Sequence, residues 1–232
     1  GWLHYGGGLE LWEEIYAPFG VVPLAAGNSG VQMAGWFNKE INSLEDIKGL
    51  KMRIPGLGGE VFQRAGGVAV TIPGGEVFTA LQTGVIDAAE WVGPYNDLAF
   101  GLQDIAKYYY YPGWHEPGAT LEAIVNSEAL HALPADLRAI LRTATRAINQ
   151  DVLDEFTARN ASALHALVEE HGVELRRLPE EVLDRFREIS SDVVAESVDG
   201  EVSERILQSY KMFLERVRGY HSISEQAYIN VR

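Results

Sequence analysis

The longest regular pattern in the sequence runs from residue 134 to residue 171 and predicts a single long helix. Pro134 suits the first turn of a helix, apolar residues recur at helical spacing from Leu137 to Val168, and Gly172 supplies a stop. At a rise of 1.5 Å per residue such a helix is about 55 Å long, which is more than a small domain needs. We therefore expect it to cross from one lobe to another or to lie along the back of both.

The residues before this helix alternate between strand-like and helix-like patterns. Short β-type runs separated by glycine-rich turns lie at 21–25, 33–37, 52–54, 68–72 and 88–92. Helices are expected at 9–16, 58–65 and 74–83, and further extended segments at 107–114 and 120–125. This alternation is typical of α/β proteins with largely buried strands.

The composition changes after Asn126, where Ala, Leu, Arg and Glu replace the glycine-rich and β-branched runs. The sequence therefore predicts an α/β ligand-binding region at 1–126, spanning parts of both lobes, and a helical region at 127–232. Within the helical region we expect a last strand at 173–177, helices at 179–195 and 201–219, and a polar tail from His221 onward.

The charge balance restricts the classes of partner. The chain has 33 acidic and 19 basic residues, a formal net charge of −14, and no cysteine. Such a charge repels nucleic acid and anionic membrane surfaces, and the lack of cysteine excludes disulfides and thiolate metal sites. No apolar run approaches the length of about 18 residues that spans a bilayer. The chain begins at Gly1 without a basic, apolar leader, so we expect a targeting segment to have been removed or never included.

Two glutamates stand at unusual positions. Glu90 follows Ala88-Ala89 at the C-terminal edge of an expected buried strand, and Glu116 lies in an aromatic turn between His115 and Pro117. Together they offer hard oxygen ligands suited to Na⁺ or Ca²⁺. The same pair could instead act as general acid and base, and Glu90 alone could simply reach water or cap the next helix.

Arg53 and Gln32 are further candidates. Arg53 is flanked by Met52 and Ile54, so its guanidinium needs a partner, either an internal acid or the carboxylate of a ligand, which it can clamp with two hydrogen bonds. Gln32 lies among small and aromatic residues, where its amide serves either a strand-edge hydrogen bond or, through its oxygen, a hard cation.

These segments together resemble a known family. The motifs LEDIKGLKMRIPG, GGEVFTALQTGVIDAAEWVGP and YYYYPGWHEPG, in this order and spacing, closely resemble the substrate-binding proteins of tripartite ATP-independent periplasmic (TRAP) transporters. Residues 6–37 resemble the branch that binds α-keto and related monocarboxylic acids together with a metal ion. The resemblance covers essentially the whole chain and implies a two-lobed fold of the periplasmic-binding-protein type, in which the long helix spans both lobes.

The resemblance also implies site residues. Arg53 would pair with the carboxylate of the ligand, and Gln32, Glu90, Glu116 and the backbone carbonyl of Trp91 would hold Na⁺ or Ca²⁺. The cation would bridge to the ligand, so that Gln32 and Trp91 also belong to the substrate site. The ligand would be a small α-keto or hydroxy monocarboxylate such as pyruvate, delivered in the periplasm to the TRAP membrane permease.

Family members carry a substantial N-terminal portion before the equivalent of GWLHYGGG, so we expect one lobe to be incomplete at its N-terminus. In this branch a C-terminal helix can pack on a second subunit, and segment 201–219 would either form such a homodimer or pack on its own chain. Two rival hypotheses remain: a metal-dependent lyase or hydrolase that uses Glu90, Glu116 and His115, and a truncated chain that dimerises and binds nothing.

Overall fold

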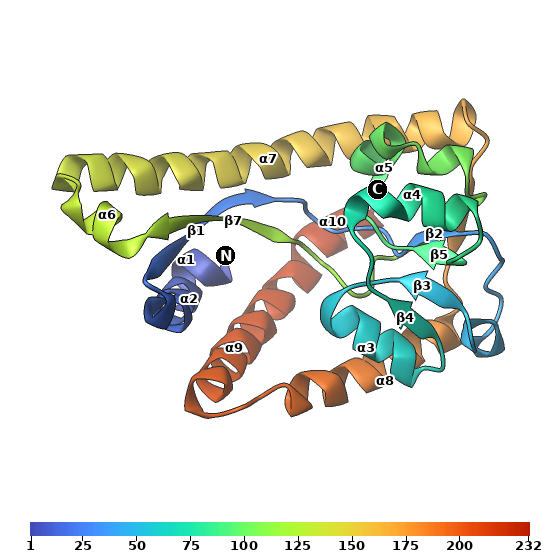
Figure 1. Cartoon of the computed structure of the whole chain (residues 1–232). Coiled ribbons are helices and arrows are strands. Elements are labelled where there is room, and N and C mark those ends of the chain that lie inside the picture. Colours follow the sequence, from blue (N-terminus) through green and yellow to red (C-terminus); the bar gives the residue numbers. More distant parts are fainter. The chain divides into compact units, whose positions relative to one another are not determined.

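The computed structural model describes residues 1–232 as two compact units (Figure 1). The first unit comprises Gly1–Leu24, Glu122–Arg142 and Glu196–Arg232, and the second comprises Ala25–Leu121 and Thr143–Ala195. The chain passes from one unit to the other within β1 (Val21–Asn28), β7 (Thr120–Asn126) and α7 (Ala135–Glu169), and again at the end of α8 (Glu180–Glu196). Strands β1 and β7 pair with each other in a two-stranded sheet.

The second unit is built on a six-stranded sheet in the order β4-β3-β5-β2-β6-β8. Its strands are β2 (Gly35–Phe37), β3 (Lys51–Arg53), β4 (Val68–Val70), β5 (Ala88–Ala89), β6 (Tyr108–Tyr111) and β8 (Glu174–Arg177). Strand β3 runs parallel to β4 and β5, and β6 runs parallel to β8, whereas β2 is antiparallel to both β5 and β6. The sheet is therefore mixed.

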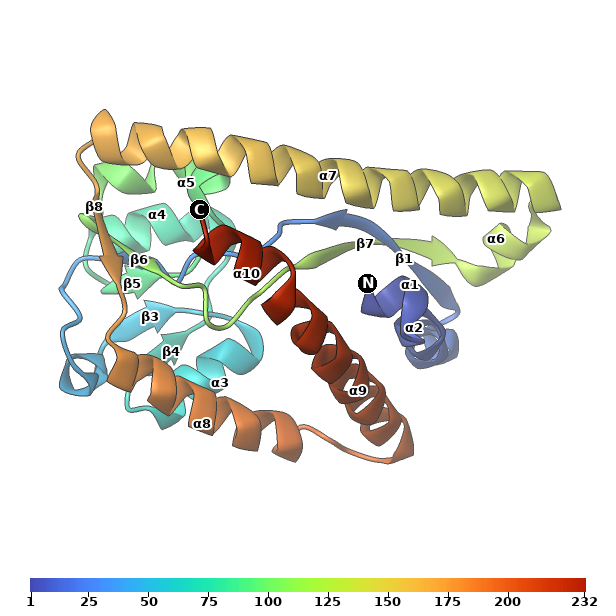
Figure 2. The ribbon, with the colours of Figure 1, turned by 180° about the vertical axis from the view of Figure 1, so that it is seen from behind.

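Helices cover both faces of this sheet (Figure 2). They are α3 (Gly56–Arg64), α4 (Gly74–Gln82), α5 (Pro94–Phe100), α8 and the part of α7 that belongs to this unit, with short 3₁₀ helices at Leu44–Ile47 and Leu102–Asp104. Because successive strand residues point to opposite faces, β6 sends Tyr110 into a core with α3 and α8 and Tyr109 into a core with α4 and α7. Strand β2 likewise places Phe37 in the core with α3 and α8, and Trp36 in the core with α4 and α7.

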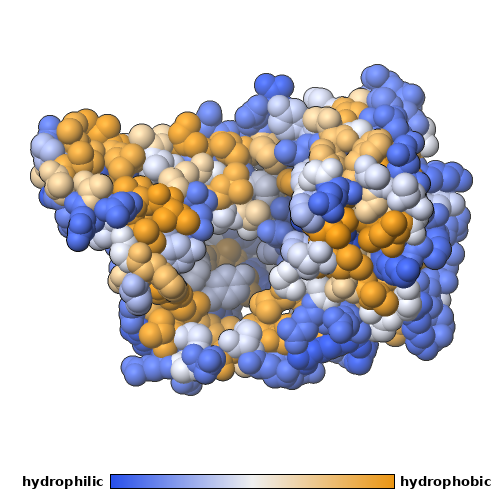
Figure 3. Space-filling view, viewed as in Figure 1, coloured by the Kyte–Doolittle hydropathy of each residue, from blue (hydrophilic) through white to orange (hydrophobic).

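The first unit consists mainly of helices: α1 (Trp2–Tyr5), α2 (Gly8–Tyr16), a 3₁₀ turn at Ala17–Phe19, α6 (Ser127–Ala132), α9 (Glu201–Ile223) and α10 (Glu225–Asn230). Trp2 links the N-terminal segment to α9, because its Nε1 donates to Ser209 Oγ at 3.1 Å and its ring meets the ring of Tyr210 edge-on. Apolar surface gathers over α6 and the beginning of α7 (Figure 3), where Leu137 and Ile140 are exposed. None of the helices combines the length and the apolar character that a membrane span requires.

Most of the expected elements are confirmed, including the long helix, which covers residues 135–169. Strand β5 is shorter than the expected run 88–92 and ends at Ala89, and β8 at the sheet edge is mostly exposed rather than buried. The prediction of a polar tail from His221 is wrong: α9 continues to Ile223 and α10 follows, because no Gly or Pro interrupts residues 220–230. The division of the chain at residue 126 stays a prediction.

Candidate functional site

The predicted site residues lie in the second unit, and two of them, Arg53 and Glu90, stand at the ends of neighbouring strands. Arg53 is the last residue of β3, and Glu90 follows the last residue of β5. The parallel register pairs Arg53 with Ala89, and the backbone N–H of Glu90 donates to the carbonyl of Arg53 at 3.0 Å. The carboxyl ends of these parallel strands therefore bring both side chains to the same edge of the sheet, where open α/β sheets commonly bind ligands.

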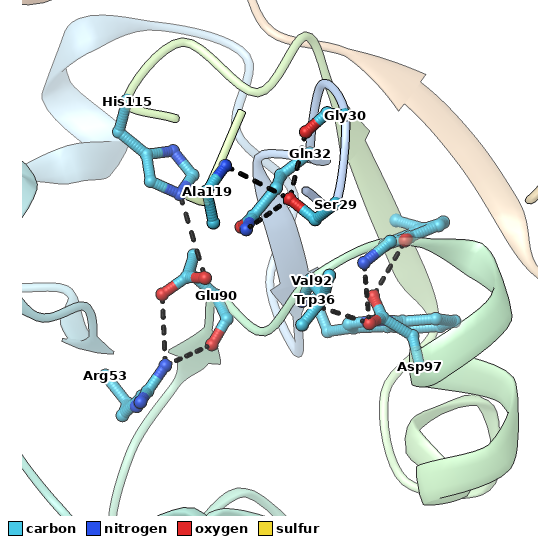
Figure 4. Close-up of polar contacts among 12 residues, drawn as sticks. Ser29, Gly30, Gln32, Trp36, Arg53, Glu90, Val92, Asp97, His115 and Ala119 are labelled. Carbon is cyan, nitrogen blue, oxygen red and sulfur yellow. Dashed lines mark hydrogen bonds and ion pairs between the residues drawn. The ribbon is translucent and has the colours of Figure 1, made fainter. Parts of the chain in front are cut away.

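Arg53 and Glu90 form a partly buried ion pair (Figure 4). Nη1 of Arg53 donates to Oε2 of Glu90 at 3.0 Å and to the backbone carbonyl of Glu90 at 2.9 Å. The Glu90 side chain is 3% exposed and that of Arg53 is 15% exposed. Both bonds use Nη1, so the N–H groups on Nε and Nη2 are not engaged by Glu90. The internal acid that the sequence allowed as a partner for Arg53 is thus Glu90.

Gln32 lies in the loop between β1 and β2 and is buried. Its Nε2 donates to Ser29 Oγ at 3.3 Å, and the same hydroxyl accepts the backbone N–H of Ala119 at 3.2 Å. Its Oε1 is buried and has no hydrogen-bond partner. A buried acceptor without a partner costs stability, so this oxygen is suited to a ligand or a cation.

Glu116 and His115 lie on the loop between β6 and β7, which packs closely on the Gln32 segment. The backbone N–H of Gln32 donates to the carbonyl of Glu116 at 3.2 Å, and a Cβ on Gly113 would lie 2.1 Å from the Gln32 carbonyl oxygen. Only glycine allows this approach of the two loops.

One possible ligand atom from each of Glu90, His115 and Glu116 lies within 4.8 Å of the others. Burial, followed by the charge of Glu90, raises the pKa of the Glu116 carboxyl.

Trp91 follows Glu90 and borders the Arg53 side chain. The guanidinium carbon of Arg53 lies 5.4 Å from the centroid of the Trp91 ring, which stacks on Phe100 with centroids 4.6 Å apart. The backbone beyond Trp91 is fixed, because the N–H of Met33 donates to the carbonyl of Val92 at 3.1 Å.

Asp97 on α5 anchors the same loop and was missed by the sequence reasoning. Its Oδ1 accepts the backbone N–H groups of Val92 (3.2 Å) and Gly93 (3.0 Å), and its Oδ2 accepts Trp36 Nε1 (2.9 Å) and Tyr109 Oη (2.7 Å). Burial raises the pKa of Asp97 to about 6, although these donors favour the ionised form. The one sequence signal that could have pointed to Asp97 is its place as an acid in the first turn of a helix that begins at Pro94.

The structure thus brings Gln32, Arg53, Glu90, Trp91 and Glu116 to one edge of the sheet. The donor set fits a hard cation, because the unpartnered oxygen of Gln32 and two neighbouring carboxylates are ligands of the kind that Na⁺ and Ca²⁺ prefer. A cation there would also offset the charge of Glu90 that raises the pKa of Glu116. The participation of the Trp91 carbonyl stays a prediction.

The chain is similar to known proteins. A family model described as "Bacterial extracellular solute-binding protein, family 7" matches residues 6–201. The chain is 43% identical over 99% of its length to a monocarboxylate 2-oxoacid-binding periplasmic protein of a Nostoc species. It spans 63% of that relative's length.

Solved structures show the same fold. A TRAP periplasmic solute-binding protein from Pseudoalteromonas atlantica with bound sodium and pyruvate has a TM-score of 0.93 and 43% identity, with 99% of this chain and 70% of that chain covered. A TRAP transporter solute-binding protein from Bordetella bronchiseptica, a mixed-occupancy dimer with calcium and picolinate at one site, has a TM-score of 0.94 and 39% identity, with 99% and 68% covered. These likenesses confirm the predicted fold class.

Proposed function

Because the chain belongs to bacterial extracellular solute-binding protein family 7, we propose that it is a receptor that binds a small 2-oxo monocarboxylate such as pyruvate together with a cation. The observation that carries this proposal is the buried, unpartnered Oε1 of Gln32, whose backbone N–H donates to the Glu116 carbonyl, together with the neighbouring carboxylates of Glu90 and Glu116. The relatives bind pyruvate, 2-oxoacids or picolinate, which are all small acids with a second donor atom next to the carboxylate.

Arg53 would bind the ligand carboxylate. Its Nη1 is occupied by Glu90, which holds the guanidinium plane in place, while Nε and Nη2 present a second pair of donors. Such an edge suits a carboxylate, because a guanidinium can donate two parallel hydrogen bonds to it. Pairing with Glu90 and binding of a ligand are therefore compatible roles of one side chain.

Gln32, Glu90, Glu116 and the backbone carbonyl of Trp91 would hold Na⁺ or Ca²⁺. When bound, the cation would supply a positive charge for the carboxylate and keto oxygens of the ligand. The protein would hold these oxygen ligands in place: Ser29 accepts a hydrogen bond from the amide of Gln32, Arg53 pairs with Glu90, and Asp97 holds the loop after Trp91. The acidic pocket would otherwise repel an anionic ligand, so we expect binding to depend on the cation.

The function is one of binding rather than catalysis. Support comes from the family, which consists of solute-binding proteins, and from the 2-oxoacid-binding relative. The protein would act in the periplasm and pass its ligand to the membrane subunits of a TRAP transporter.

A thermal-shift screen tests the proposal. Pyruvate, 2-oxobutyrate, lactate, succinate and glutamate would each be added, as sodium-free salts, with Na⁺, with Ca²⁺ or with a chelator in a sodium-free buffer. A ligand at 100 times its Kd adds about 2.7 kcal/mol to the free energy of unfolding, so the expected result is a cation-dependent rise in Tm with one or two monocarboxylates. A rise of equal size in chelator, or none with any acid, would contradict the proposal.

The C-terminal helices would mediate a homodimer. Ile223 at the end of α9 and Tyr228, Ile229 and Val231 in and after α10 are exposed apolar side chains. Exposed apolar side chains concentrated in one segment favour a contact surface, and the Bordetella bronchiseptica relative was crystallised as a dimer. Light scattering of the wild type should give twice the monomer mass, and Ile229→Asp with Tyr228→Ser should give a monomer. A monomeric wild type would contradict the dimer.

A further inference from the structure

The imidazole of His115 has no function in the site described so far. Its side chain is 4% exposed, and neither Nδ1 nor Nε2 has a hydrogen-bond partner. A buried histidine usually satisfies at least one ring nitrogen, because an unpaired polar group costs about 1–3 kcal/mol. Both ring nitrogens of His115 are therefore free to bind a ligand or an ion.

The ring is directed at the carboxylate of Glu90 (Figure 4). Nε2 lies 3.8 Å from Glu90 Oε1, and one atom from each of Glu90, His115 and Glu116 falls within 4.8 Å of the others. Ligand atoms bound to one ion at about 2.0–2.3 Å lie about 3–4.5 Å from one another. The cluster therefore needs little movement to surround a single ion.

We propose that Nε2 of His115 is an additional ligand for the ion held by Glu90 and Glu116, so that the site also accepts divalent first-row transition metals such as Mn²⁺ and Co²⁺. This inference rests on the proposed function, since it concerns the same cation site. The inference differs from the proposed function in one respect: the proposed function uses only oxygen ligands, whereas His115 would add a nitrogen ligand.

The physical reason is the chemistry of the donors. Imidazole suits transition metals, whereas Na⁺ and Ca²⁺ take oxygen ligands and gain little from a nitrogen. Two carboxylates, an amide oxygen and one imidazole form a mixed donor set. His115 would therefore raise the affinity for Co²⁺ or Mn²⁺ much more than that for Ca²⁺, and it sets the metal selectivity of the site.

The test is a titration of the chelator-treated full chain with Co²⁺, followed by visible absorption and calorimetry, and a parallel titration with Ca²⁺. We expect one Co²⁺ per chain in the wild type. His115→Phe should weaken Co²⁺ binding at least tenfold and leave Ca²⁺ binding within about threefold. If His115→Phe folds poorly by circular dichroism, His115→Gln keeps a polar side chain of similar size for the same comparison.

His221→Gln is the matched control, because His221 is the other histidine paired with a carboxylate, with Nδ1 3.0 Å from Glu225 Oε2 on an exposed helix. This variant should bind Co²⁺ like the wild type. Unchanged Co²⁺ affinity in His115→Phe, or no stoichiometric Co²⁺ binding in the wild type, would overturn the inference.

A calorimetric titration of pyruvate in Ca²⁺ separates this inference from the proposed function. Pyruvate binding in Ca²⁺ without any effect of His115 on Co²⁺ would overturn the inference alone. Co²⁺ binding that depends on His115, without pyruvate binding in any cation, would support the metal ligand and contradict the receptor.

Discussion

Arg53 binds Glu90 through a single nitrogen, Nη1, which donates hydrogen bonds to the Glu90 carboxylate at 3.0 Å and to the Glu90 backbone carbonyl at 2.9 Å. This contact joins the ends of β3 and β5 and leaves the other edge of the guanidinium for a ligand. Arg53 is thus both a structural residue and a candidate binding residue, and its two roles can be separated by experiment.

Replacing Arg53 should affect stability and binding differently according to the substituent. Arg53→Ala leaves Glu90 buried without its cation, so the free energy of unfolding should fall by about 3 kcal/mol. Arg53→Lys keeps the charge but loses the two-donor edge, so stability should be largely kept while pyruvate affinity falls at least tenfold. Urea unfolding and calorimetry measure the two effects. Wild-type affinity in Arg53→Lys would contradict the carboxylate role.

Gln32→Met should remove cation binding at little cost in stability. The variant loses the Ser29 hydrogen bond but also removes the unpartnered buried Oε1, and the two effects are each about 1 kcal/mol and opposite in sign. We therefore expect a Tm close to that of the wild type without cation and no rise in Tm when Ca²⁺ and pyruvate are added. A wild-type rise would show that the amide oxygen is not a ligand.

Glu116→Gln should stabilise the cation-free protein slightly. Burial and the charge of Glu90 raise the pKa of the Glu116 carboxyl, so its ionised form is disfavoured and a neutral amide relieves the repulsion. The same change removes a charged ligand, so Ca²⁺ affinity should fall at least tenfold. Thermal unfolding with and without Ca²⁺ measures both effects, and a loss of stability without cation would argue against this explanation.

Asp97 should make stability depend on pH in the acid range. Its pKa is raised from 3.8 to about 6 in the folded protein, so folding favours the protonated form. The stabilisation that protonated Asp97 adds to the free energy of unfolding is fully present below pH 3.8 and is lost as the pH rises through about 6. The total change is on the order of 3 kcal/mol. Urea unfolding across this range, with Asp97→Asn as the comparison, measures it. If the free energy of unfolding changed with pH in the same way in the wild type and in Asp97→Asn, Asp97 would not be the group responsible.

The sequence predicted that Arg53 and Glu90 stand near the ends of short strands, and the structure places them there. Glu90 follows a short apolar run and Arg53 ends another, and the carboxyl ends of parallel strands meet at one edge. The order of the strands was not predictable in this way, because β2 enters the sheet antiparallel between β5 and β6.

The sequence could not reveal contacts that need several distant segments at once. The Asp97 network joins α5 to β2 through Trp36 and to β6 through Tyr109, and no local pattern links these residues. The choice between an internal acid and a ligand for Arg53 was also open, because it depends on how far β3 and β5 extend. The unpartnered state of His115 became visible only when the loop between β6 and β7 was placed beside Glu90.

The most direct test of the cation-bridged site is a calorimetric titration of pyruvate into the full chain, in Ca²⁺ and in a sodium-free buffer with chelator. We expect one pyruvate per chain in Ca²⁺, at least tenfold weaker binding in chelator, and recovery of unchanged pyruvate afterwards. Equal affinity in both buffers would contradict the cation-bridged site, and conversion of the pyruvate would contradict a receptor.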